Sequence, residues 1–388
     1  MTSLGRVDLR DHPRRARPDV VMVGIVAVLT ALGLILIYSA SAPRLRLVGD
    51  NPNDLMIRQL IFVAIGVAAM IGGSLITDRS WRMLTPLVFA GVTLLLLVTI
   101  SPLGVERQGA QRWIPFGIMD LQPSELAKPA VVLALAVLLT PENEIGVTWR
   151  RIGKVAALVA LPAALIFMQP DFGTMLVFGF ISVVMLFMAG TTTRQLMILL
   201  VGALLVMVAI IELDLLRDYQ LARIIGFLNP GSDPLSVNYN QIQSQITIGN
   251  GGLLGSGLLQ GAQTNLAFVP AQSTDFIFTA LAEQLGFLGA AVVLALYTVL
   301  IWRMLAVSVA ARDKFAQLVA GGIAAMFAFH VFVNVGMTLG LLPVTGLPLP
   351  FMSFGGSFYL GTAISVGIVN AIWMNRSPVP GDRRLASL

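Results

Sequence analysis

Residues 20–39 read VVMVGIVAVLTALGLILIYS and contain no charged side chain. Crossing the hydrocarbon core of a bilayer takes roughly 20 apolar residues in a helix, so this stretch predicts a membrane span. An arginine-rich start precedes it, and Ala40-Ser41-Ala42 resembles a signal cleavage site. The apolar run is nevertheless longer than the roughly 7–15 residues of a secretory signal, and we expect a retained first span.

Similar apolar runs recur along the whole chain. They lie near residues 60–77, 83–101, 124–140, 153–169, 172–190, 195–211, 276–301, 315–339 and 357–375. Hydrophobic residues make up 56% of the 388 positions and charged residues 12%, whereas a soluble domain carries about 25% charged residues. The sequence predicts an all-α integral membrane protein, a single polytopic domain over residues 1–388 with about ten transmembrane helices.

The distribution of Lys and Arg predicts the orientation, because basic residues concentrate in cytoplasmic loops. With tails 1–18 and 376–388 in the cytoplasm, most basic residues lie inside. Both ends inside requires an even number of spans, which agrees with ten. The long connections 102–123, 212–275 and 340–356 then lie outside. The basic residues left outside are Arg44, Arg46, Arg58, Arg107, Arg112, Arg217 and Arg223.

The connection 212–275 is predicted to be a large, structured extracytoplasmic loop, since it is too long for a passive connector. Apolar residues follow helical spacing over 221–228 and again over 239–246. Such amphipathic helices suit the bilayer interface. A glycine-rich stretch follows over 249–261. It predicts either a flexible loop or a close approach of the backbone to a ligand such as phosphate.

Carboxylates at membrane depth are costly and are therefore candidates for function. Asp275 immediately precedes an apolar run, where it is either a helix cap or a general base at the outer mouth of the bundle. Glu283 follows two turns later and needs a partner at that depth. Asp171, between Pro170 and Phe172, is either a turn residue or a second carboxylate close to Asp275.

Several cations accompany these acids. Lys128 lies three residues after Glu125, which predicts either a local ion pair or a lysine that holds an anionic group in a cavity. Arg107 and Arg112 depart from the positive-inside pattern, and arginine suits phosphate. Trp113 beside them is either an interfacial anchor or part of that site.

Residues His330 and Asn334 share a face of one predicted span, and we interpret them as a buried polar contact between helices. There are two histidines and no cysteine in the chain, so we expect no metal site built from histidine or cysteine. The sequence identifies no cofactor and leaves assistance by a divalent cation open. Acids and cations at a lipid interface suit a lipid-linked phosphate substrate.

These residues lie in motifs that resemble those of the SEDS family of bacterial cell-wall proteins (shape, elongation, division and sporulation), and within it the RodA branch. The resemblance covers nearly the whole chain. Its motifs are Arg112-Trp113-Ile114, the run from Gln122 to Lys128, Gln169 to Thr174, Phe227-Leu228-Asn229-Pro230, Gln243-Ser244 with Gly251-Gly252, Thr274 to Phe278, and Thr345 to Ser357.

The resemblance implies a peptidoglycan glycosyltransferase that polymerises lipid II during cell elongation and releases undecaprenyl pyrophosphate. It implies the bacterial cytoplasmic membrane, a class B penicillin-binding protein as partner and no nucleic acid. Asp275 matches the family's catalytic aspartate. The predicted substrate-binding residues are Arg107, Arg112, Trp113, Glu125, Lys128, Asp171, Arg217, Arg223, Gln243 and Ser244.

Two positions depart from the family pattern. Ala271 stands where the family usually has Glu, and Gln284 stands where it usually has a second Glu after Glu283. Two other functions remain open from the sequence: a flippase for a lipid-linked precursor, and a non-catalytic membrane scaffold of the elongation machinery. An internal repeat would favour the flippase, and the sequence shows none.

Overall fold

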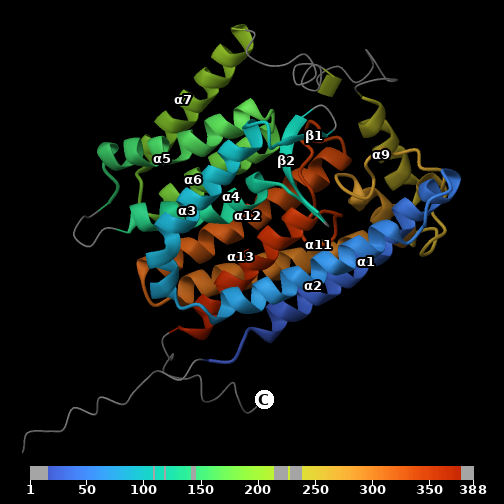
Figure 1. The fold of residues 1–388 in the computed structure, drawn as a ribbon, viewed down its shortest axis with the longest axis horizontal. Coiled ribbons are helices and arrows are strands. Elements are labelled where there is room, and N and C mark those ends of the chain that lie inside the picture. Colours follow the sequence, from blue (N-terminus) through green and yellow to red (C-terminus); the bar gives the residue numbers. More distant parts are fainter. Residues whose placement is uncertain are drawn as a thin grey trace, which may run out of the picture.

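The structure, a computed structural model, describes residues 16–107, 110–117, 119–140, 146–213, 226–227 and 238–376. Helices pack into one bundle, with a small sheet and short helices at one end (Figure 1). The long helices are α1 (Val20–Leu47), α2 (Asp54–Leu75), α3 (Asp78–Ile100), α4 (Pro123–Leu139), α5 (Trp149–Met168), α6 (Phe172–Met188), α7 (Thr193–Glu212), α11 (Ile277–Ala310), α12 (Lys314–Thr338) and α13 (Gly356–Met374). The shorter helices are α9 (Tyr239–Asn250) and α10 (Ala262–Asn265).

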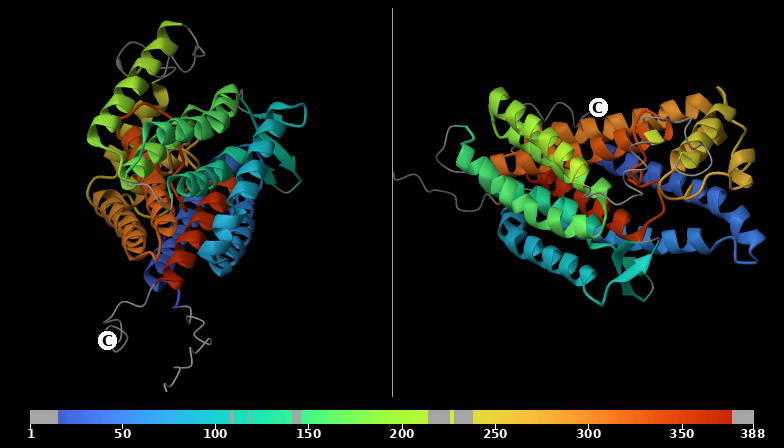
Figure 2. Two further views of the ribbon diagram at one scale, coloured as in Figure 1. Left: turned by 90° about the vertical axis from the view of Figure 1, so that its left-hand side faces the viewer. Right: turned by 90° about the horizontal axis from the view of Figure 1, so that it is seen from above.

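These long helices coincide with the ten predicted runs. Within the described ranges, 8 are long and apolar enough to cross a membrane, and α6 is a shorter apolar helix. Helix α4 carries Glu125 and Lys128 in its 17 residues. The multi-span, all-α prediction is thereby confirmed, although α1 and α11 extend well beyond the predicted boundaries. Helix α7 has no buried residue and projects from the bundle (Figure 2).

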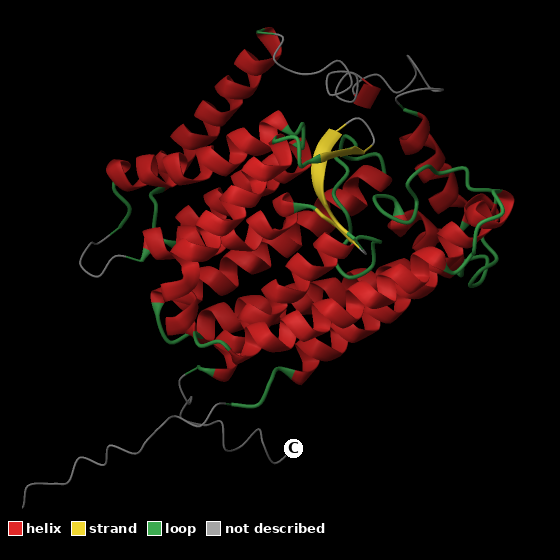
Figure 3. Ribbon diagram, in the orientation of Figure 1, coloured by secondary structure: helices red, strands yellow, loops and turns green. Residues whose placement is uncertain are grey.

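The predicted outer connection 102–123 contains a sheet that the sequence analysis did not anticipate. Strands β1 (Val105–Arg107), β2 (Ala110–Phe116) and β3 (Met119–Leu121) pair antiparallel in the order β1-β2-β3 (Figure 3). Trp113 is paired with Val105, and Ile114 with Leu121. Two of the strands have three residues each, which is too short for an alternating pattern to emerge.

The described chain ends meet at one end of the bundle, here called the termini face. The backbone N–H of Ala16 donates to the carbonyl of Met374 at 2.9 Å. Asp19 caps α1 and accepts hydrogen bonds from the guanidinium of Arg303 at 2.6 and 2.9 Å. The opposite end, with the sheet, α9 and the segment 340–355, is here called the loop face. An even number of spans between the ends accounts for their shared face.

Helix α11 is broken at Gly286, where φ is 66° and ψ is −169°. The break interrupts the helical ladder and leaves backbone groups on both sides without intrahelical partners. The glycine-rich segment supplies those partners, in four hydrogen bonds of 2.9–3.2 Å: Ser256 N to Glu283 O, Gly257 N to Gln284 O, Phe287 N to Gly252 O and Leu288 N to Leu253 O. The segment therefore satisfies backbone groups of α11 that the break leaves without partners inside the helix.

The two halves of α11 cannot be collinear. A straight helix would place residues 274 and 297 about 35 Å apart. Yet Tyr297 donates to the carbonyl of Pro350 at 2.5 Å, and Ser353, three residues later, donates to the carbonyl of Thr274 at 2.5 Å. The break thus folds the first half, residues 277–285, back beside the second.

The glycines of the segment 249–261 are explained by this packing. A Cβ added at Gly251 would overlap the carbonyl oxygen of Ala282, and one at Gly255 would overlap the backbone of Gln284. The segment is an ordered part of the fold and not a flexible loop. Its backbone closely approaches the backbone of α11, and the predicted close approach to a ligand such as phosphate stays a prediction. The other predicted helix of this connection, 221–228, lies largely outside the described residues.

Candidate functional site

Asp275 lies in a tight turn immediately before α11. The carbonyl of Ala271 accepts hydrogen bonds from the backbone N–H groups of Thr274 and Asp275, both at 3.1 Å. Ala271 itself has a φ of 51°, a conformation uncommon outside glycine. Helix α11 begins at Ile277 with Phe276 in the cap position, so the interpretation of Asp275 as a helix cap is wrong.

Three successive carbonyls of this turn are held by other parts of the chain. Each accepts one hydrogen bond from a group on the segment 340–355 or on α12. The pairs are Phe354 N to Ser273 O at 2.8 Å, Ser353 Oγ to Thr274 O at 2.5 Å and Asn334 Nδ2 to Asp275 O at 2.8 Å. Fixing three carbonyls in a row fixes the path of the backbone and so the origin of the Asp275 side chain.

The second part of the segment 340–355, over residues 347–353, is largely buried, with Leu349 and Met352 at 0% exposure. Irregular backbone at membrane depth requires partners inside the protein, and side chains supply them. The carbonyl of Leu347 accepts from Asn334 Nδ2 at 2.7 Å, and that of Pro348 pairs with His330 Nδ1 at 3.1 Å. Helix α12 therefore holds both this segment and the Asp275 turn.

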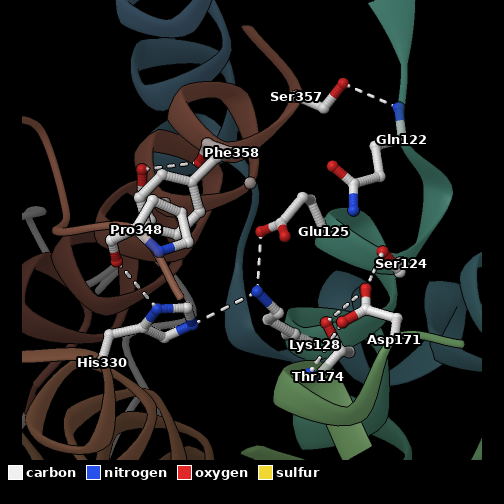
Figure 4. Close-up of polar contacts among 12 residues, drawn as sticks. Gln122, Ser124, Glu125, Lys128, Asp171, Thr174, His330, Pro348, Ser357 and Phe358 are labelled. Carbon is white, nitrogen blue, oxygen red and sulfur yellow. Dashed lines mark hydrogen bonds and ion pairs between the residues drawn. The ribbon is translucent and has the colours of Figure 1, made fainter. Parts of the chain in front are cut away.

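A buried polar chain runs from α4 to α12 (Figure 4). Lys128 Nζ lies 2.7 Å from Glu125 Oε2 and 3.2 Å from His330 Nε2, and the lysine is 2% exposed. An ammonium group only donates, so His330 Nε2 accepts and its Nδ1–H donates to the Pro348 carbonyl. The predicted Glu125–Lys128 ion pair is confirmed, and so is the predicted contact between helices for His330. Asn334 is buried as predicted, but its partners Asp275 O and Leu347 O lie in non-helical segments.

Asp171 caps α6 (Figure 4). Its carboxylate accepts from Thr174 N at 3.2 Å, from Thr174 Oγ1 at 3.0 Å and from Ser124 Oγ at 3.3 Å. The preceding turn is fixed by Arg112, whose guanidinium donates to the carbonyls of Gln169, at 2.8 Å, and of Pro170. Arg112 thus joins strand β2 to the turn that presents Asp171.

One short segment lies against Asp275 and against the start of α6, the helix that Asp171 caps. A Cβ added at Gly173, two residues after Asp171, would lie 3.0 Å from the carbonyl of Thr345. A Cβ added at Gly346 would lie 3.4 Å from Asp275 Oδ2. The start of α6 and the Asp275 carboxylate therefore flank residues 345–347. This supports the expectation that the two carboxylates belong to one region.

Other predicted site residues have structural contacts or lie beyond the described part. Ser244 is buried in α9 and donates to the carbonyl of Thr338 at 2.7 Å. Gln243 is half-buried on the same helix, and Trp113 is half-buried in β2. Arg107 is described only as a backbone position of β1. Arg217 and Arg223 lie outside the described residues.

Sequence reasoning missed the uncharged residues that position the turn. Ser353, Gln272 and Thr264 each bind a neighbour across the chain, and a polar side chain at such a position carries no periodic signal. The Gln284 amide uses both of its polar atoms: Oε1 accepts from Leu259 N at 2.8 Å and Nε2 donates to Ser39 Oγ at 2.9 Å. In the described part of the chain, no group of three His, Cys, Asp or Glu side chains could hold a metal ion.

Comparison with known proteins identifies the family. The model of the FtsW, RodA and SpoVE family, described as cell cycle protein, matches residues 19–377. The peptidoglycan glycosyltransferase MrdB of Escherichia coli K12 is 36% identical over 362 residues, 92% of this chain and 94% of that protein. Stage V sporulation protein E of Bacillus subtilis is 38% identical over 359 residues, 92% and 97% of the two chains.

Solved structures agree with these relatives. A chain from a peptidoglycan synthase complex that coordinates polymerization and crosslinking superposes with a TM-score of 0.77 and 30% identity, covering 93% of this chain and 99% of that one. The rod shape determining protein RodA of Thermus thermophilus superposes with a TM-score of 0.69 and 28% identity, covering 93% and 98%. The chain belongs to the SEDS family of membrane proteins, together with RodA, FtsW and SpoVE.

Proposed function

We propose that this chain is a peptidoglycan glycosyltransferase that polymerises lipid II into glycan strands during cell elongation. The observation that carries the proposal is the match to curated glycosyltransferases over more than nine-tenths of the chain, with 36% identity to MrdB. The geometry supports it, because the turn that carries Asp275 is fixed at three successive carbonyls. A fixed carboxylate suits general-base catalysis, which depends on positioning.

In the proposed reaction, Asp275 accepts the proton of the glucosamine 4-hydroxyl of an incoming lipid II. The hydroxyl oxygen forms a bond to the anomeric carbon of the terminal muramoyl sugar of the growing strand. The bond from that carbon to pyrophosphate breaks, and undecaprenyl pyrophosphate leaves with the electron pair. The attack inverts the configuration at the anomeric carbon.

Cations stabilise the charge that develops on the leaving pyrophosphate. Arg112 is one candidate, since the guanidinium has five N–H groups and two of them account for its bonds to the Gln169–Pro170 turn. Lys128 is a second, held beside Glu125 and His330. Arg107, Arg217 and Arg223 complete the proposed set, with Trp113, Gln243 and Ser244 as further substrate-binding positions.

The proposed location is the bacterial cytoplasmic membrane, with both termini in the cytoplasm. The positive-inside bias supports this orientation, and so does the shared position of the described ends on the termini face. The loop face then lies outside, where the wall is built. The likeness to a chain of a synthase complex that couples polymerization to crosslinking supports a class B penicillin-binding protein as partner.

The test is polymerisation of lipid II by the purified full-length protein together with its partner. Asp275→Asn should abolish polymer, while Asp54→Asn should leave the yield unchanged. Asp54 is a matched control because it forms an exposed ion pair with Arg58, at 2.9 Å, at the start of α2. Normal polymer from Asp275→Asn would overturn the assignment of the base.

Two alternatives have distinct outcomes in the same preparation. A flippase would move lipid-linked precursor across vesicle membranes without forming polymer. A scaffold would do neither, yet would still bind its partner. Polymer formation by the wild type, lost in Asp275→Asn, excludes both as the main activity.

A further inference from the structure

The Glu283 carboxylate is fully buried and accepts four hydrogen bonds, although the proposed reaction gives it no part. Its exposure is 0%. Oε1 accepts from Asn250 Nδ2 at 3.1 Å and from Gln263 N at 2.8 Å. Oε2 accepts from Thr264 N at 3.0 Å and from Thr264 Oγ1 at 2.6 Å. These four donors are uncharged, so dipoles balance this buried charge.

The donors come from two helices of the loop face that are separated along the sequence. Asn250 ends α9, whereas Gln263 and Thr264 lie in α10. A Cβ added at Gly261 would lie 2.5 Å from Glu283 Oε2, so glycine at this position lets the chain lie against the carboxylate without displacing it. Glu283 therefore ties both ends of the glycine-rich segment to the first half of α11.

Thr264 passes this constraint on toward Asp275. Its hydroxyl donates to Glu283 and accepts from Gln272 Nε2 at 3.0 Å. Gln272 Nε2 also donates to Thr279 Oγ1 at 3.0 Å. A chain of hydrogen bonds thus runs from Glu283 through Thr264 and Gln272 to Thr279. Gln272 directly follows Ala271, whose carbonyl closes the Asp275 turn.

We infer that Glu283 is a positioning residue for Asp275: through Thr264 and Gln272 it fixes the side of the turn that the segment 340–355 does not reach. The expected effect of Glu283 on the polymerisation rate rests on the proposed function. Its expected effect on the structure of the turn does not. Four donors need four acceptor sites, and an ionised carboxylate offers about four. A glutamine in place of Glu283 would turn N–H groups toward these donors.

The first experiment measures lipid II polymerisation by full-length variants in complex with the partner. Thr264→Val removes the relay hydroxyl and keeps the shape of the side chain. It should lower kcat about 10-fold or more with little change in KM, because a small misplacement of a catalytic group has effects of this size. Thr298→Val is the matched control, since that hydroxyl bonds only within α11, to Leu294 O at 2.8 Å, and is exposed.

The second experiment distinguishes positioning from general damage. Glu283→Gln should lower kcat at least as much as Thr264→Val. Combining it with Asn250→Asp exchanges donor and acceptor across that hydrogen bond and should restore part of the rate. Thr264→Val with wild-type kcat would overturn the inference, and so would a double variant no better than Glu283→Gln.

The third experiment keeps the inference testable if the wild type forms no polymer, which would refute the proposed function alone. Hydrogen exchange of the full chain in lipid nanodiscs should then show faster exchange over residues 263–276 in Thr264→Val and Glu283→Gln, and no change in Thr298→Val. Unchanged exchange over 263–276 in both variants would overturn the inference independently of activity.

Discussion

Two buried carboxylates near the site are neutralised in different ways. Glu125 lies beside a cation, Lys128, at 2.7 Å. Glu283 receives four hydrogen bonds from uncharged groups. The first arrangement joins a few side chains of neighbouring helices, whereas the second gathers a side chain of α9 and the backbone of α10 around one carboxylate. A buried carboxylate can therefore either pair with one side chain or hold a length of backbone in place. Substitutions at the two sites should lower stability by different amounts.

The largest effect is expected where a cation is removed. Lys128→Met leaves the Glu125 carboxylate buried without its partner and should lower the free energy of unfolding by about 3–5 kcal/mol. The double variant Glu125→Gln/Lys128→Met should recover most of that loss while remaining inactive. Reversible unfolding of the purified protein in mixed detergent measures both. A single variant as stable as the double would show that Glu125 is not held by charge.

A smaller effect is expected where the carboxylate organises backbone. Gly261→Ala places a methyl group against Glu283 and should lower the free energy of unfolding by about 1–3 kcal/mol, the usual cost of overpacking. Gly249→Ala is its control, because a Cβ there meets nothing within 4 Å. The same unfolding measurement compares them. Equal stability of the two variants would mean that the segment is free to move away from Glu283.

The smallest effect on stability is expected at Asp171, a third buried carboxylate. Like Glu283, it accepts hydrogen bonds from uncharged donors. Ser124→Ala removes one of them and should cost about 1 kcal/mol, the typical value of one hydrogen bond. Ser182→Ala in α6 removes a hydroxyl that bonds only to its own helix, at Phe178 O, and should change stability by less than about 0.5 kcal/mol. A loss above about 3 kcal/mol at Ser124 would place Asp171 with Glu125 as a charge-dependent site.

The spans were predictable, and so was the position of both chain ends on one face, because hydropathy and the positions of Lys and Arg act over whole segments. The Glu125–Lys128 pair was also predictable, since a spacing of three places both on one helix face. Ambiguity remained at Asp275, where the same residue type serves as a cap or as a base. Only the start of α11 at Ile277 excludes the cap.

What the sequence could not predict depends on contacts between distant residues. The bond from Asn334 to Asp275 O joins positions 59 apart, and that from Gln284 to Ser39 joins positions 245 apart. The break at Gly286 is equally hidden, because a single glycine inside an apolar run is compatible with an unbroken helix. The glycine-rich segment was ambiguous for the same reason, since its partner is the backbone of another element.

The break in α11 also separates two roles of one stretch of sequence, insertion into the membrane and the placement of buried polar side chains. Residues 287–310 alone would form a helix about 36 Å long, which is enough to cross a hydrocarbon core of about 30 Å. Insertion of this segment into the membrane during synthesis therefore does not need the preceding half-helix. Residues 277–285 therefore do not need to be hydrophobic for insertion. They can carry Glu283 and Gln284 without weakening the signal that inserts the span.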